Sequence, residues 1–96
     1  MRPPDLVGNA KLIAYLVLNE NNIRTGNTEH FAGGKLMETF YGLAICRYEN
    51  EKGFYLFYCD SSWETIADTC HDSVEDAKDQ ATFEYTNTEN SWVYIK

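Results

Sequence analysis

The chain has 96 residues, of which 44% are hydrophobic and 15% aromatic, and its formal net charge is −7. This length and composition predict a single folded domain over residues 1–96 and exclude a disordered chain, while the acidic balance argues against nucleic acid and anionic membrane surfaces as partners. The three cysteines lack the spacing of a metal site, so we expect free thiols in a reducing, cytoplasmic compartment, with no metal and no cofactor.

The first third of the chain predicts one strand between two irregular segments. Residues 1–9 contain two prolines and a glycine and are expected to form an irregular arm. Residues 11–18 form an apolar run that ends in an asparagine-rich stretch, which favours a buried strand over a helix. Residues 19–35 are polar and contain three glycines, so we expect a long polar loop, of a kind that is often mobile or functional.

The middle of the chain predicts a β-hairpin. Residues 36–49 are expected to form a strand, bent near Gly42, and residues 54–60 an aromatic strand that returns antiparallel after a turn. A two-residue turn would place Tyr48 opposite Tyr55. Both faces of this hairpin are apolar, so we expect it to be central in a sheet and covered on both sides.

The next segment predicts a third strand followed by a helix. One face of the strand is expected to hold Trp63, Thr65, Ala67, Thr69 and His71. Ser73 is of a residue type that caps a helix, and the acidic residues after it suit the positive end of the helix dipole. The helix carries an apolar stripe suited to packing on a sheet, which consists of Val74, Ala77, Ala81 and Tyr85.

We expect the helix to end by residues 86–87, and residues 91–96 to form a final short strand or a docking tail. These elements together predict an α+β fold. Its expected form is an antiparallel sheet of about four strands with one main C-terminal helix packed on a face.

The second half of the chain also follows a recognisable pattern. It runs Tyr55-x-Leu-Phe-Tyr-Cys-Asp60, Trp63, Asp68-Thr69-x-His71-x-Ser73 and Ala77-x-x-Gln80-Ala81-x-x-Glu84-Tyr85. The pattern resembles a family of small acidic bacterial α+β domains that has no established activity. In size, charge and fold, the chain is more loosely similar to the small acidic immunity partners of toxins, which implies a protein-binding role and names no catalytic residue.

The densest polar group lies at the strand-to-helix junction and consists of Asp68, Thr69, His71 and Asp72. These residues either form a small site in which the first helical N–H groups bind an anion, or only cap the helix and bond locally. Cys70 is next to His71, but neighbouring strand residues point to opposite faces, so a thiol–imidazole pair is not expected. We therefore predict that the protein is not an enzyme.

Phe83 projects from the predicted helix on the side opposite to the apolar stripe, near Asp76 and Asp79. It is either an exposed anchor of a protein-interaction surface or a core residue covered by the tail around Trp92. The leading hypothesis is a non-catalytic, acidic protein-interaction or regulatory domain that binds a basic partner through Phe83 and the carboxylates of Glu75, Asp76 and Asp79.

Two alternatives stand beside this hypothesis. One is a small-ligand pocket between the sheet and the 19–35 loop, formed by Tyr55, Tyr58, Trp63 and His71. The other is a homodimer formed through a sheet edge or through the aromatic tail. Trp63 taken by itself, at the exit of a turn, is expected to be a lid on the core.

Overall fold

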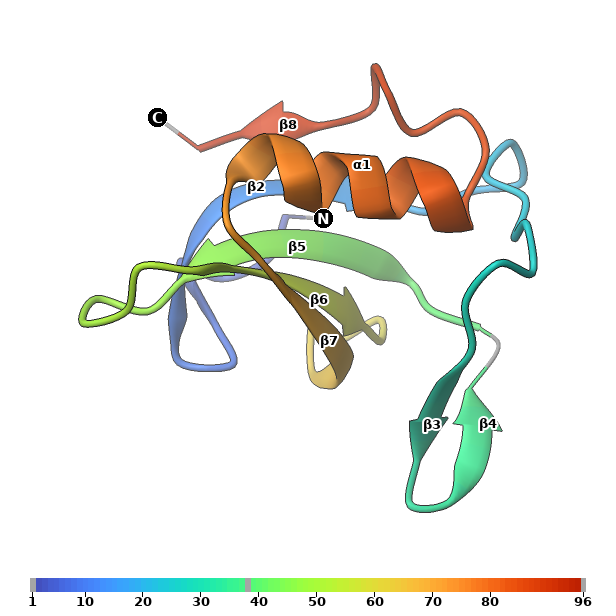
Figure 1. The fold of residues 1–96 in the computed structure, drawn as a ribbon, viewed down its shortest axis with the longest axis horizontal. Coiled ribbons are helices and arrows are strands. Elements are labelled where there is room, and N and C mark those ends of the chain that lie inside the picture. Colours follow the sequence, from blue (N-terminus) through green and yellow to red (C-terminus); the bar gives the residue numbers. More distant parts are fainter. Residues whose placement is uncertain (1, 38, 96) are drawn as a thin grey trace.

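Apolar side chains cover both faces of a curled antiparallel sheet, and a helix packs across one of these faces (Figure 1). The computed structural model describes residues 2–37 and 39–95. Its elements in chain order are β1 (Leu6–Val7), β2 (Ala10–Val17), β3 (His30–Ala32), β4 (Lys35–Met37), β5 (Gly42–Arg47), β6 (Phe54–Cys59), β7 (Thr65–His71), α1 (Val74–Glu84) and β8 (Val93–Tyr94). The predicted α+β class is confirmed.

Within the described residues, the main sheet has six strands, more than the four expected. Strands β1-β2-β5-β6-β7 lie side by side in this order, each antiparallel to its neighbour, and β8 pairs with β2. Strands β3 and β4 form a separate hairpin that projects from the body (Figure 1). The strands that were not predicted, β1 and β3, have only two or three residues, too few to show the alternation by which a strand is recognised in a sequence. The single strand predicted over residues 36–49 is wrong in its extent, because residues 36–37 belong to β4 and only residues 42–47 form β5.

The two segments expected to be irregular are therefore partly corrected. The arm, residues 1–9, contains β1, and the Asp5 carbonyl accepts a hydrogen bond from the Leu12 N–H at 2.9 Å. The 19–35 segment contains β3 and the start of β4. Its first part is tied to the end of α1, where Asn22 Nδ2 donates to the Thr86 carbonyl at 2.8 Å.

The β5–β6 hairpin has the predicted faces but not the predicted register. Cys46, and not Tyr48, lies opposite Tyr55, because the connection is longer than two residues and closes with a bond from the Glu51 N–H to the Tyr48 carbonyl at 3.1 Å. A shift of two residues leaves every side chain on its predicted face. The helix-side layer receives Leu43, Ile45, Leu56 and Tyr58, and the opposite layer receives Ala44, Cys46, Phe57 and Cys59.

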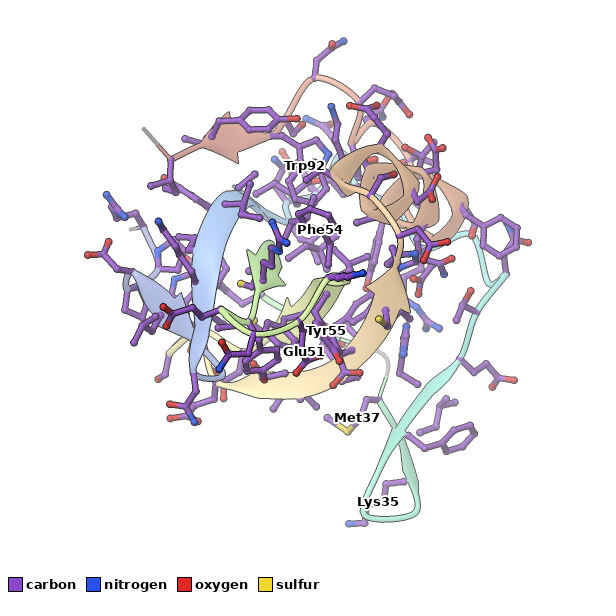
Figure 2. All side chains as sticks on the ribbon, turned by 60° about the vertical axis from the view of Figure 1, so that its left-hand side comes forward. Lys35, Met37, Glu51, Phe54, Tyr55 and Trp92 are labelled. Atoms are coloured by element: carbon purple, nitrogen blue, oxygen red, sulfur yellow. The ribbon has the colours of Figure 1, made fainter. Side chains whose placement is uncertain are left out.

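Figure 2 shows the same division of the sheet. Phe54 and Trp92 lie on the side of the helix, whereas the next residue, Tyr55, lies on the other side near Glu51. The Tyr55 hydroxyl donates to Glu51 Oε1 at 2.9 Å, and this bond is the main reason that the pKa of Tyr55 is raised to about 12. The bond ties the turn after β5 to the first residues of β6.

An irregularity in β7 changes which of its side chains face the helix. Ala67 lies opposite Tyr58 in the helix-side layer, but the register then shifts, and Thr65 lies opposite Cys59. The prediction that Trp63 and Thr65 share a face with His71 is therefore wrong. Such a bulge adds a residue to one strand of a pair and leaves no mark in the sequence that hydrophobic alternation can detect.

The helix begins and packs as predicted. The Asp76 N–H donates to Ser73 Oγ at 3.0 Å, which makes Ser73 the N-cap. Of the apolar stripe, Ala77, Ala81 and Tyr85 are buried in the helix-side layer, and the two alanines let the helix approach the sheet closely. The described part of the chain contains no helix with the length and apolarity needed to cross a membrane.

Trp63 closes the opposite layer. Its side chain is 5% exposed and is met edge-on by the rings of Tyr15 and Tyr41, with centroid distances of 5.8 and 5.6 Å. The backbone of Trp63 has φ of 61°, a conformation that is rare for a bulky residue. Its indole lies directly over Gly42, so the glycine has a steric reason: a side chain there would occupy the space of the ring. The bend predicted near Gly42 lies at Tyr41, directly before β5.

We expect Gly42→Ala to lower the free energy of unfolding by about 2–3 kcal/mol, because overpacking a rigid core displaces its side chains. The new Cβ would lie 2.5 Å from Trp63 Cη2 and 3.0 Å from the Leu16 carbonyl oxygen. Urea unfolding measures the change. The matched control is Gly53→Ala, whose Cβ would meet only Cys70 Sγ at 3.2 Å and the His71 carbonyl at 3.5 Å. An equal loss of stability in both variants would contradict this account.

Candidate functional site

The net negative charge of the protein comes from the second half of its sequence. Residues 1–52 carry six acidic and six basic side chains, whereas residues 53–96 carry nine acidic and two basic ones. The second half forms β6, β7, α1 and β8, so the charge gathers on the side of the sheet that includes β7 and the helix. The exposed carboxylates of the second half are Glu64, Asp68, Asp72, Glu75, Asp76, Asp79 and Glu89.

Phe83 is exposed. Its side chain retains 52% of its accessible surface, so the interpretation in which the tail around Trp92 covers it is wrong. Trp92 packs instead in the helix-side layer, on the inner side of the helix. Asp76 and Asp79 precede Phe83 by seven and four positions. This spacing places all three on one stripe of the helix surface.

The basic residue of the helix points away from this stripe. Lys78 Nζ donates to the Tyr94 hydroxyl of β8 at 3.0 Å, and this bond is the main cause of the raised pKa of Lys78. Lys78 also lies 3.7 Å from Glu75, so Glu75 is partly compensated. Among the described residues, no ion pair to Asp76 or Asp79 is present.

Asp68 does not join the carboxylates of the helix. It lies opposite Phe57 in the β6–β7 pair, and Phe57 belongs to the layer on the far side of the sheet from α1. The structure therefore brings together four of the predicted binding residues and separates Asp68 and Trp63 from them. We call the surface formed by Asp72, Glu75, Asp76, Asp79 and Phe83 the acidic helix face.

His71 lies beside the acidic helix face and is neutral at neutral pH. Its Nε2 is 2.6 Å from Thr69 Oγ1. Burial lowers the pKa of His71 below the ordinary value of 6.5, against the opposing effect of the Asp76, Glu84 and Asp72 carboxylates. His71 thus bonds locally and supplies no positive charge, and Asp76 and Asp72 are among the carboxylates that act on it electrostatically.

A buried carboxylate, which the sequence analysis did not single out, lies under the helix. Glu84 is 4% exposed. Its Oε1 lies 2.6 Å from His30 Nε2, and its Oε2 accepts hydrogen bonds from the Tyr58 hydroxyl and, at 2.9 Å, from Gln80 Nε2. Since an ionised carboxylate only accepts hydrogen bonds, the His30 tautomer that fits this contact carries its proton on Nε2. Glu84 follows Ala77 by seven positions, and this spacing was the available signal that it lies on the buried face.

Aromatic rings enclose this cluster. The His30 ring lies 4.1 Å from the Tyr58 ring and 5.8 Å from the Phe40 ring, centroid to centroid. Burial, and then the bond to Glu84, raise the pKa of Tyr58 far above its ordinary value, so its hydroxyl is a donor throughout the neutral range. The cluster joins α1, β6 and β3, and both oxygens of its carboxylate are occupied by donors of the protein itself.

The four residues proposed for a small-ligand pocket do not converge. Tyr58 and His71 are on the helix side of the sheet, whereas Tyr55 and Trp63 are on the opposite side. Two surface depressions, of about 900 and 440 Å³, lie next to the β1–β2 hairpin, and no residue of the 19–35 segment lines them. The described residues contain no group of three or more His, Cys, Asp or Glu side chains arranged to hold a metal ion.

Comparison of the chain with protein-family models, with curated proteins and with solved structures finds no match in any of the three. The resemblance to small acidic bacterial domains thus stays a prediction. Function has to be inferred from the geometry of the acidic helix face and of the cluster around Glu84.

We expect NMR titration to give His71 a pKa below 6.5, and Asp76→Asn to lower it further, because the Asp76 carboxylate favours the imidazolium. A depressed pKa in the folded state means that the unfolded state binds the proton first as the pH falls. The contribution of His71 to stability is therefore present above pH 6.5 and is lost as the pH falls through the folded pKa. A His71 pKa that rises in Asp76→Asn, or that falls equally in Glu49→Gln, would contradict this assignment.

Glu84→Ala is expected to lower the free energy of unfolding by about 3–5 kcal/mol, because it leaves buried donors without an acceptor. Tyr58→Phe removes one donor and keeps the others paired, so we expect a cost of about 1 kcal/mol. The control is Glu89→Ala, an exposed glutamate, for which the change should stay within about 0.5 kcal/mol. Denaturant unfolding of the three variants measures this order, and equal costs for Glu84→Ala and Glu89→Ala would contradict it.

Proposed function

We propose that this domain is a non-catalytic protein-binding module that binds a basic partner through the acidic helix face. The observation that carries the proposal is the exposure of Phe83, at 52%, on the same stripe of the helix as Asp76 and Asp79. An exposed aromatic side chain within a rim of carboxylates has the composition of an interaction hot spot for a cationic surface.

The charge distribution supports the same partner chemistry. No lysine or arginine occurs between Lys52 and Lys78, and Lys78 is directed to Tyr94 on β8. A one-sided negative field accelerates encounter with a positively charged partner and repels acidic ones. The partner surface that fits is therefore rich in lysine or arginine and offers an apolar side chain or pocket to Phe83.

The proposal places the protein in a reducing compartment, the cytoplasm, and in the size and charge class of the bacterial immunity partners of toxins. Support for the compartment comes from the thiols. Cys46, Cys59 and Cys70 are free, and burial is the main reason that the pKa values of Cys46 and Cys59 are raised to about 12. The two buried thiols are unreactive, which fits a role without cysteine chemistry, whereas Cys70 is exposed.

A homodimer is the second candidate function. Strand β8 lies at the margin of the sheet, and its side chains Val93 and Tyr94 are each 48% exposed. Exposed apolar side chains on an edge strand favour association with a second copy. Sedimentation over a range of protein concentrations tests it, and a monomer at high concentration would exclude it.

We expect a lysine-rich peptide that carries one tryptophan to bind this protein and to perturb the backbone NMR signals of α1 and the end of β7. Phe83→Ala should weaken this binding by about tenfold, as for an aromatic hot spot. The double variant Asp76→Asn/Asp79→Asn should bind more slowly and lose most of the dependence on salt.

Matched controls come from other surfaces of the same chain. Leu6→Ala removes an exposed apolar side chain, 59% accessible, from β1, and Glu20→Gln/Glu89→Gln removes two exposed charges outside the acidic helix face. If these controls weaken binding as much as the helix variants do, or if the peptide perturbs signals over the whole surface, then the attraction is only nonspecific and the proposal fails.

A further inference from the structure

The two exposed phenylalanines of the protein flank one buried contact. Phe31 follows His30 in the sequence, Phe83 precedes Glu84, and His30 and Glu84 are 2.6 Å apart. The His30 and Glu84 side chains retain only 10% and 4% of their accessible surface, while Phe31 and Phe83 retain 62% and 52%. The buried pair thus fixes the backbone from which both exposed rings project.

The β3–β4 hairpin has an inner and an outer face. His30 lies opposite Met37, and both contribute to the interior, His30 through Glu84 and Met37 through the helix-side layer. Phe31 lies opposite Leu36, which is 39% exposed. Since neighbouring strand residues point to opposite faces, Phe31 and Leu36 form an outward apolar pair. Figure 2 shows Met37 on the side of the hairpin that faces the body and Lys35 at its tip.

The chain before the hairpin is fixed to the helix at Phe83. Thr25 Oγ1 and Asn27 Nδ2 both donate to the Phe83 carbonyl, at 2.6 and 2.9 Å. Phe31 is only four residues beyond Asn27, a span of at most about 14 Å of extended chain. Phe31, on the outer face of the hairpin, is therefore connected to the backbone of the acidic helix face by only four residues of chain.

We propose that Phe83 and the outward pair Phe31–Leu36 form one composite binding surface, and that the His30–Glu84 contact is the latch that positions the hairpin for it. This inference rests on the proposed function and specifies its partner further. The partner is a chain segment with two apolar anchors, one for the helix and one for the hairpin, with lysine or arginine around them.

The charge and the position of the two rings determine which kind of partner fits the composite surface. The anchor site on the helix is surrounded by Asp76 and Asp79, so the segment that covers it must be positive, which disfavours a second copy of this acidic chain. Phe31 belongs to β3 and Phe83 to α1, so the proposal gives each ring its own apolar anchor in the partner. His30 and Glu84 do not touch the partner and act only by positioning.

The first measurement needs no partner. In the free protein, His30→Ala should raise amide exchange in residues 30–37 by at least about tenfold, because the hairpin loses the contact that anchors it, while exchange in β5 and β6 stays as in the unmodified protein. The control is Glu29→Ala, which changes an exposed residue directly before the hairpin. Unchanged exchange in His30→Ala overturns the latch.

The second measurement uses lysine-rich peptides that carry two tryptophans, separated by spacers of different length. Phe31→Ala is an exposed substitution that preserves the fold, and it should weaken the best peptide by about tenfold while leaving a one-tryptophan peptide unaffected. His30→Ala should weaken the two-tryptophan peptide to a similar extent. When His30→Ala is already present, adding Phe31→Ala should weaken binding of the two-tryptophan peptide little further. The reason is that the hairpin is no longer held where Phe31 can contact the peptide.

The outcomes separate this inference from the function on which it rests. If Phe83→Ala weakens binding but Phe31→Ala does not, the acidic helix face binds alone and the composite surface is wrong. If Phe31→Ala and His30→Ala act additively, the latch does not position the hairpin. If none of the three variants affects either peptide, both proposals fail. If the protein sediments as a dimer that Phe31→Ala dissociates, the occupant is a second copy and the assigned partner is wrong.

Discussion

Strand β6 presents large side chains to both faces of the sheet, and the need to bury both is the constraint from which the architecture follows. Leu56 and Tyr58 face the helix, and Phe57 and Cys59 face the other way. One helix can cover only one face. The other face is closed by the β1–β2 hairpin, which places Val7 and Ala10 in the same layer as Phe57, and by Trp63, which folds over Gly42. Two thin apolar layers therefore share a sheet, and the sheet curls to enclose the second.

This arrangement places the hydroxyl of Tyr58 where no water reaches it. Tyr58 is fully buried on the helix side, and its hydroxyl needs an acceptor within the protein. Glu84 provides this acceptor from the last turn of α1, and its second oxygen is then satisfied by His30 from β3. A buried carboxylate with donors on both oxygens is specific in geometry, because no apolar residue can take its place without leaving those donors unpaired. The aromatic core thus determines where the hairpin docks.

Features with local determinants could be predicted from the sequence, and features that depend on distant partners could not. Ser73 as a cap, the Ala77–Ala81 stripe and the two faces of β5–β6 follow from residue type and periodicity. The bulge in β7 depends on contacts across the fold. Strands β1 and β3 instead pair locally, through the tight turns Gly8-Asn9 and Gly33-Gly34 with positive φ, and this turn signal was overlooked because the strands are too short for a hydrophobic pattern. For the site, periodicity placed Phe83 outside the apolar stripe. The same periodicity placed Glu84 inside it, but the usual preference of a charged residue for water concealed its burial.

The two ends of the helix are fixed by different contacts, and this difference explains why one surface is available for binding. At its end, α1 is held by Glu84, by the 19–27 segment and by Tyr85, so its position does not depend on the carboxylates at its start. Asp72, Glu75 and Asp76 gain only the modest stabilisation of a helix N-terminus, and Asp79 has no such role. Mutual repulsion of these charges acts against the fold, and neither packing nor capping accounts for Phe83 among them. A cationic partner with an apolar anchor would relieve the repulsion and cover the ring, which is a physical reason for both features to occupy the same face.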